Sequence, residues 1–132
     1  MAFDSAPEIA FYIWLNDVKD IIDIDFEYSP PVKFEYFLLD KKHVYMPDFR
    51  IGDHYFEIKG DHFFKDGKMI CPYRRKDWTD EFYYSICAVY EAKHQCMIDN
   101  DVTILMSSDY KFFIDYVAEN YGREHISTFK NY

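Results

Sequence analysis

Residues 46–60, MPDFRIGDHYFEIKG, decide how the chain is interpreted. Two extended runs flank Ile51 and Gly52, HVYMPDF over 43–49 and HYFEIK over 54–59. Two such runs closed around Ile51-Gly52 predict a β-hairpin.

The hairpin carries acidic side chains at mid-strand positions. With Ile51-Gly52 as the turn, Asp48 faces Tyr55 and lies diagonal to Glu57, at a backbone separation of about 7–8 Å. Burying unpaired charges would cost several kcal/mol, and a shared cation would offset that cost. Oxygen ligands suit Mg²⁺. The alternative is that Glu57 and Lys59 belong to the solvated face of an antiparallel strand. The residues expected on that face are Asp53, Tyr55, Glu57 and Lys59, and those expected toward the core are His54, Phe56 and Ile58.

Helices and strands are expected on both sides of the hairpin in the order α-β-β-β-α-β-α, as one α/β domain over residues 1–132. Ser5 precedes Pro7 and Glu8, which is typical of a helix start, and Gly122 is a typical helix end. About twenty residues after Gly60 show no periodicity. The other expected elements are an extended run at 21–28, a second at 33–39 followed by a turn at 40–42, a helix at 80–99, a strand at 102–106, and a helix from Ser108-Asp109 to Tyr121.

Composition limits the function classes. The 132 residues include 15 Lys and Arg against 24 Asp and Glu, a net charge of −9, and 21% are aromatic. This balance argues against a histone-like or polybasic membrane-binding protein. The only strongly basic stretch is 59–76, with six basic and two acidic residues. Its cations after Lys59 are the expected nucleic-acid contacts: Lys65, Lys68, Arg74, Arg75 and Lys76.

The motif at residues 47–60 resembles that of the PD-(D/E)XK nuclease superfamily. Asp48 follows Pro47, and Glu57-Ile58-Lys59-Gly60 ends the next strand. The resemblance implies a restriction-endonuclease-like αβββαβ core, with a mixed central sheet flanked by helices and here an extra C-terminal helix. Within the superfamily the chain is most similar to small phage-type endonucleases, including endonuclease I-like Holliday-junction resolvases and homing or restriction types.

The resemblance implies a metal-dependent endonuclease acting on DNA, branched DNA included. Asp48, Glu57 and the Ile58 carbonyl would hold Mg²⁺, for which Mn²⁺ would substitute, and Lys59 would orient the attacking water. Glu8, on the apolar stripe of the first helix, would complete the metal site. The alternative is that it is an acid in the first turn that the helix dipole favours. Lys93, on the apolar stripe of the long helix, would contact the phosphate; its alternative is to snorkel.

Two other functions remain open. A catalytically silent protein-binding module on the same fold, such as a phage-type regulator, would suit the acidic charge and the many aromatic residues. An RNA-directed nuclease would use the same site. Junction specificity would normally require a homodimer.

The sequence also bears on the location of the protein, its cysteines and its cofactors. The N-terminal residues lack the pattern of a signal peptide, no run is long enough to span a membrane, and we expect a cytoplasmic protein, in the host if phage-encoded. Cys71, Cys87 and Cys96 are expected to be reduced thiols. No Gly-rich phosphate loop occurs, so no nucleotide cofactor is expected.

Overall fold

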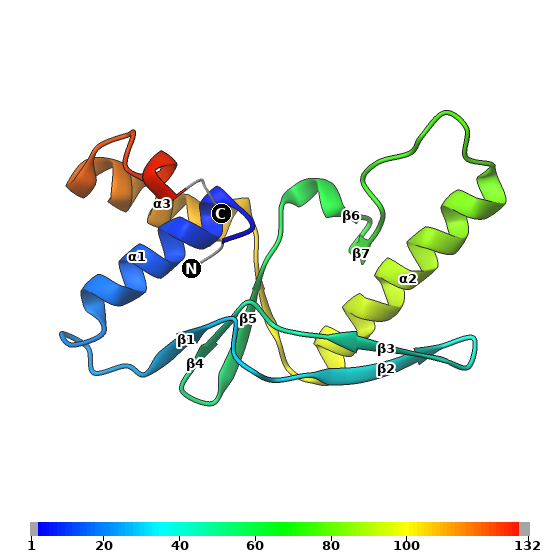
Figure 1. The fold of residues 1–132 in the computed structure, drawn as a ribbon, viewed down its shortest axis with the longest axis horizontal. Helices are drawn as coiled ribbons and strands as arrows, with labels where there is room; N and C mark the ends of the chain where they lie inside the picture. The colour runs from blue at the N-terminus through cyan, green and yellow to red at the C-terminus, as the bar shows by residue number, and fades with distance from the viewer. Residues whose placement is uncertain (1–2, 130–132) are drawn as a thin grey trace.

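The computed structural model describes residues 3–129, which form an α/β fold with a mixed four-stranded sheet and three α-helices (Figure 1). The sheet order is β1-β4-β5-β8, and two further two-stranded sheets are formed by β2-β3 and β6-β7. The elements are α1 (Ala6–Val18), β1 (Phe26–Tyr28), β2 (Phe34–Leu38), β3 (Lys41–Tyr45), β4 (Phe49–Ile51), β5 (His54–Ile58), η1 (Asp61–Phe63), β6 (Phe64–Lys65), β7 (Lys68–Met69), α2 (Asp80–Asp99), β8 (Thr103–Leu105), α3 (Ser107–Tyr121) and η2 (Ile126–Phe129).

Strand β5 is central, because it pairs with β4 on one side and β8 on the other. The β1-β4 and β4-β5 pairs are antiparallel, and β5-β8 is parallel. A parallel pair needs a long crossover, which the segment containing α2 provides between β5 and β8. The predicted helix at 80–99 and the strand within 102–106 are confirmed.

The β4-β5 hairpin is confirmed, but the predicted turn is wrong by one residue. Ile51 pairs with His54, so the turn residues are Gly52 and Asp53, and Gly52 has a φ of 57° that favours glycine. Arg50 therefore faces Tyr55, where Asp48 was expected. Gly52-Asp53 is a dipeptide typical of two-residue hairpin turns, whereas Ile51-Gly52 is not.

The first strand of the predicted hairpin is also different. Residues 43–49 do not run as one strand: β3 ends at Tyr45 and pairs with β2, and β4 begins at Phe49 in the main sheet. Pro47, which lacks an N–H for a strand ladder, lies in the connection between the two. Likewise, the extended run expected at 21–28 forms a strand only over 26–28.

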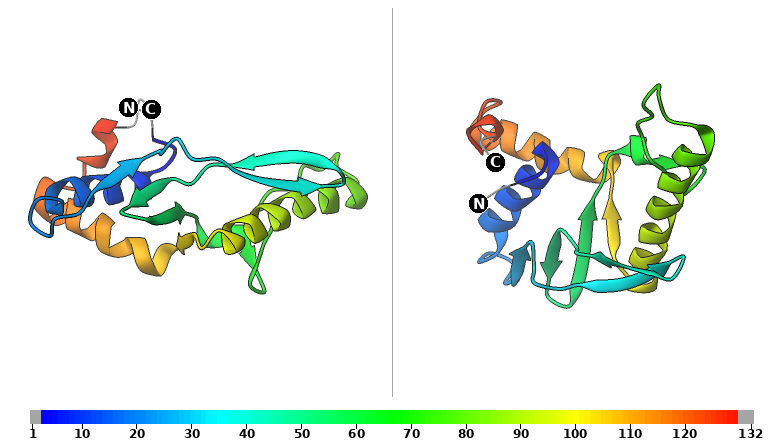
Figure 2. Two further views of the ribbon diagram at one scale, coloured as in Figure 1. Left: turned by 90° about the horizontal axis from the view of Figure 1, so that it is seen from below. Right: turned by 45° about the vertical axis from the view of Figure 1, so that its right-hand side comes forward.

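The three helices enclose the sheet from two sides. Helices α1 and α3 pack together, whereas α2 lies with β2, β3 and β7 on the other side of β5 and β8, as Figure 2 shows. Phe56 and Ile58 lie in the core as predicted, in a cluster that includes Phe11 and Phe49, but His54, also expected toward the core, is exposed at the start of β5. The opposite face of the sheet is closed by a second cluster of buried residues: Tyr45, Met69, Cys96 and Met97.

Helix ends follow their capping chemistry. The predicted start of α1 is confirmed: Ser5 is its N-cap and accepts from the Glu8 N–H. The start of α3 differs by a few residues, because its N-cap is Met106, and the Asp109 carboxylate inside the helix accepts from the Met106 N–H at 2.9 Å. Gly122 ends α3 with a φ of 94°, as predicted.

The segment after Gly60 is more regular than predicted. It contains the 3₁₀ turn η1 and the short β6-β7 hairpin, closed by Asp66 and Gly67, both with positive φ. Cys71 and Cys96 are buried and all three cysteines are unpaired, as expected. Among residues 3–129, no helix combines the length and apolar character of a membrane span.

Candidate functional site

The predicted acidic residues meet around the C-terminal half of β5. The Asp48 N–H donates to the Phe56 carbonyl at 3.1 Å, although Phe56 is already the partner of Phe49. Asp48 and Phe49 thus both lie opposite Phe56, as in a β-bulge, which commonly changes the direction in which a side chain points. The Asp48 side chain reaches along β5, where its Oδ2 accepts from the Ile58 N–H at 2.8 Å.

Glu57 is buried beside Asp48, with 4% of its surface exposed. Its Oε1 accepts a hydrogen bond from the Tyr45 hydroxyl at 2.7 Å, and its Oε2 lies 3.6 Å from Lys59 Nζ. Burial raises the pKa of Glu57 above its usual range. The alternative that this residue belongs to a solvated strand face is therefore wrong.

Glu8 approaches the same place from the first turn of α1 and is also 4% exposed. Its Oε2 accepts from the Tyr28 hydroxyl at 2.8 Å and from the Asp4 N–H at 3.4 Å. Burial, followed by repulsion from Asp48, raises the pKa of Glu8 to about 7. Glu8 thus points inward, as predicted, and faces a second carboxylate.

Asp48 is coupled to both other acids. Burial and repulsion from Glu57 raise its pKa to about 7, although the Ile58 N–H, Lys59 and Lys93 oppose the shift. Three carboxylates from α1, the β3-β4 connection and β5 therefore share one site that resists negative charge. A cation would stabilise such a cluster.

The two predicted lysines stand beside these carboxylates. Lys59 Nζ lies 4.5 Å from the Phe63 ring centroid, and Lys93 Nζ from α2 lies 5.7 Å from the centroid of Tyr45. Burial and repulsion from Lys59 lower the pKa of Lys93, whereas Glu57 and Asp48 act in the opposite direction. Lys93 therefore faces the site instead of only snorkelling to solvent.

The donor set has the chemistry of an oxygen-ligated cation site. Oδ1 of Asp48 and Oε1 of Glu8 accept no hydrogen bond from residues 3–129, while the second oxygen of each is held by a donor. No group of three or more His, Cys, Asp or Glu residues in that range is arranged to hold a metal. Asp48 and Glu57, with the Ile58 carbonyl and water ligands, would still be a fitting set for Mg²⁺, which commonly keeps several waters.

Two pockets adjoin the site and share Lys59 and Phe63 in their walls. One, of about 320 Å³, is also lined by Glu8, Ile58 and Gly60. The other, of about 410 Å³, is lined by aromatic residues and Lys93. A ligand lying across Lys59 would contact both pockets.

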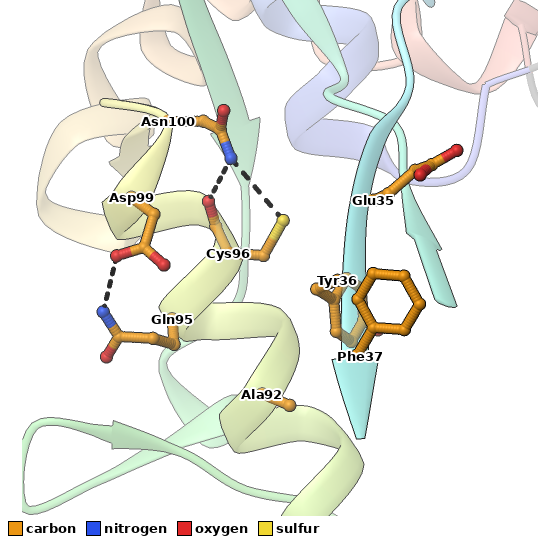
Figure 3. A pocket seen from close by; sticks show the side chains of 8 residues that line it. All are labelled: Glu35, Tyr36, Phe37, Ala92, Gln95, Cys96, Asp99 and Asn100. Atoms are coloured by element: carbon orange, nitrogen blue, oxygen red, sulfur yellow. Dashed lines mark hydrogen bonds between the residues drawn. The ribbon is translucent and has the colours of Figure 1, made fainter. Parts of the chain in front are cut away.

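A third pocket, of about 390 Å³, lies between β2 and the C-terminal half of α2 (Figure 3). Its walls include Glu35, Asp99 and Asn100, and the Asn100 side chain donates to the Cys96 carbonyl at 2.8 Å. It contains none of the predicted catalytic residues.

The cations of the predicted nucleic-acid interface are exposed, but several are paired locally. Lys68 pairs with Glu91, Arg74 with Asp80, and Arg75 with Asp77. Lys65 and Lys76 are exposed and make no ion pair with residues 3–129. The loop thus offers nucleic acid less uncompensated charge than its sequence suggests.

Sequence reasoning missed two tyrosines that orient the carboxylates. Tyr45 holds Glu57, and Tyr28 holds Glu8. Tyr45 is 1% exposed. A buried tyrosine needs a hydrogen-bond partner, but that signal does not identify the partner from sequence.

Comparison of the chain with protein-family models, curated proteins and solved structures found no match.

Proposed function

We propose that the chain is a Mg²⁺-dependent endonuclease that hydrolyses DNA phosphodiester bonds. The observation that carries the proposal is the convergence of Glu8, Asp48, Glu57, Lys59 and Lys93, from separate parts of the chain, on one site. Structural stability does not require three carboxylates to lie together, because each raises the pKa of another. Acids with perturbed pKa values beside a cleft are typical of a functional site, and Glu8 lines one of the two adjoining pockets.

The arrangement of elements supports the resemblance to PD-(D/E)XK nucleases. Helix α1, strands β1, β4 and β5, helix α2 and strand β8 follow one another in the αβββαβ order that the resemblance implies. We propose that these elements are a restriction-endonuclease-like core, to which β2-β3, β6-β7 and α3 are added. The motif residues lie on β5 and just before β4, where that core would carry them.

Each residue has a distinct role in the proposal. Asp48, Glu57 and the Ile58 carbonyl would hold Mg²⁺, and Glu8 would hold one of its water ligands. The bound ion would supply the positive charge that polarises the phosphoryl group and lowers the pKa of the attacking water. Lys59 orients that water and balances charge as the phosphorane oxygens develop. Lys93 binds a phosphate oxygen through its ammonium, which is a compact positive charge.

The tyrosines position the acids in this proposal. The Tyr45 hydroxyl fixes Oε1 of Glu57, and the Ile58 N–H fixes Oδ2 of Asp48. Each carboxylate is thereby held in one orientation before substrate arrives. Such preorganisation reduces the rearrangement required during catalysis.

A substrate panel tests the proposal. Purified protein is incubated with supercoiled DNA, linear duplex, single-stranded DNA, a four-way junction and RNA, each with Mg²⁺, Mn²⁺ or EDTA. We expect cleavage of at least one DNA substrate with either cation and none with EDTA. Failure to cleave any DNA substrate contradicts the proposal, and cleavage of RNA alone favours the RNA-directed alternative. Preference for the junction would call for a measurement of the oligomeric state.

A silent protein-binding module is the second candidate. The local pairing of Lys68, Arg74 and Arg75 favours it, because these ion pairs reduce the attraction of the basic loop for phosphate. Calorimetric titration with Mn²⁺ distinguishes the two. The nuclease should bind Mn²⁺ at a site that Asp48→Asn removes, whereas a silent module has no need of such a site.

A further inference from the structure

The pocket of about 410 Å³ beside the acidic site combines aromatic surface with positive charge. Its volume lies in the range of small-molecule sites. Strands β2 and β3, helix α2 and the segment after β7 contribute its walls. Tyr36, Lys59, Tyr73, Tyr90 and Lys93 line it.

The aromatic rings in this pocket are accessible. Tyr73 is 61% exposed, and Tyr36 is half-buried and stacked on His43, with centroids 5.2 Å apart and planes at 16°. Tyr90 lies 6.2 Å from Phe63, with ring planes at 30°. These rings line a cavity, so they offer faces or edges to a flat ligand.

The two ammonium groups restrict the class of ligand. A purely apolar ligand would leave Lys93, which makes no ion pair with residues 3–129, without an anion, and a simple anion would leave the tyrosine rings unused. A nucleotide has an aromatic base and a phosphate and satisfies both. Because Lys59 also pairs with Glu57, the phosphate of a nucleotide in this pocket would lie next to the carboxylates.

We propose that this pocket binds an unpaired base of a DNA strand whose adjoining phosphate lies at Lys59 and the acidic site. The proposal rests on the proposed nuclease function and specifies its substrate class: DNA with single-stranded nucleotides at the cleavage point. A base within a duplex is stacked on both faces and paired at its edge, so it reaches such a pocket only after leaving the helix. Stacking on aromatic side chains is tolerant of base identity, so little sequence preference is expected.

Binding without cleavage tests the proposal. Fluorescence anisotropy at low ionic strength, with EDTA present, compares three labelled ligands: an octamer of thymidine, an octamer with the same backbone but no bases, and a blunt duplex. The two octamers carry the same phosphates, so they separate base recognition from electrostatic attraction. The protein should bind the thymidine octamer about 5- to 100-fold more tightly than the abasic octamer.

Variants of one exposed tyrosine locate the effect. Tyr73→Ala should weaken binding of the thymidine octamer toward that of the abasic octamer, and Tyr73→Phe should retain the affinity. The matched control is Tyr84→Ala, which removes a tyrosine that is 65% exposed and does not line the pocket. Equal binding of the two octamers, tighter binding of the duplex, or an equal effect of Tyr84→Ala overturns the proposal.

The outcomes separate this inference from the proposed function. DNA cleavage with Mg²⁺ combined with equal binding of the two octamers refutes the base pocket and leaves the nuclease proposal standing. Base-dependent binding without cleavage of any substrate supports the base pocket and refutes the nuclease proposal.

Discussion

At the scale of single residues, Glu8 and Asp48 create a pH dependence with a defined sign. Without metal their pKa values are each about 7, above the ordinary 4.5 and 3.8. The folded state therefore binds these protons more tightly than the unfolded chain does. The resulting contribution to the free energy of unfolding is lost as pH rises from about 4 to about 7. In EDTA, we expect urea titrations to give a lower free energy of unfolding at pH 8 than at pH 5.

Asp48→Asn tests the origin of that pH dependence. The amide removes a charge but can still accept from the Ile58 N–H, so the metal-free variant should be more stable at pH 8 by about 1–3 kcal/mol. The matched control is Asp53→Asn, because Asp53 is exposed in the turn of the same hairpin and should change stability by less than about 0.5 kcal/mol. Equal effects of the two variants would contradict the proposed charge repulsion.

Tyr45→Phe tests how Glu57 is held. The change deletes only the hydroxyl that donates to Oε1 of a buried carboxylate, and a hydrogen bond to a charged group contributes about 1.5–3 kcal/mol. We expect thermal unfolding at a lower temperature and slower cleavage, since Glu57 can then rotate. Unchanged stability together with unchanged cleavage would show that Tyr45 does not position Glu57.

At the scale of elements, the two helix caps form a matched pair. Ser5 caps α1 three residues before Glu8, and Thr79 caps α2 far along the helix from Lys93. Ser5→Ala and Thr79→Ala should each destabilise the fold by about 0.5–2 kcal/mol in urea titrations. Only Ser5→Ala should also lower the cleavage rate, because it loosens the turn that aims Glu8. Equal cleavage rates in the two variants would show that the α1 cap does not position Glu8.

Elements with strong local signals could be predicted from the sequence. The capped start of α1 and the glycine after α3 have direct chemical causes, and the structure follows them. The prediction misplaced the hairpin turn by one residue, although Gly52-Asp53 is a typical turn dipeptide, and that shift exchanges the facing residues. Nor did the alternation before Pro47 show that β3 and β4 belong to different sheets.

The candidate site was predictable only as a set of residues. Spacing placed Asp48 and Glu57 near each other, and the resemblance pointed to Glu8 and Lys93. The bulge at Asp48 and the hydrogen bonds from Tyr28 and Tyr45 depend on contacts between elements distant in sequence. Local patterns carry no information about such contacts.

At the scale of the whole molecule, the net charge of −9 is compatible with a nucleic-acid enzyme when it is divided by location. Three acids lie in the site itself, where a divalent cation would neutralise much of their charge. Mg²⁺ should therefore stabilise the whole fold, by about 2.7 kcal/mol at 100 times its dissociation constant. Thermal unfolding should shift upward with Mg²⁺ in wild type and in Asp53→Asn, but not in Asp48→Asn. An equal shift in all three would indicate nonspecific binding to the acidic surface.

We expect the buried acids to be required for metal-dependent cleavage of DNA. The most direct measurement is the single-turnover cleavage rate of an end-labelled DNA substrate with Mg²⁺, for wild type, Glu57→Gln and Asp53→Asn, with circular dichroism to confirm that each is folded. We predict cleavage by wild type and Asp53→Asn at similar rates, and loss of at least about 100-fold in folded Glu57→Gln, as expected when an electrostatic catalytic group is removed. Equal rates in all three proteins, or no cleavage by wild type, would contradict the claim.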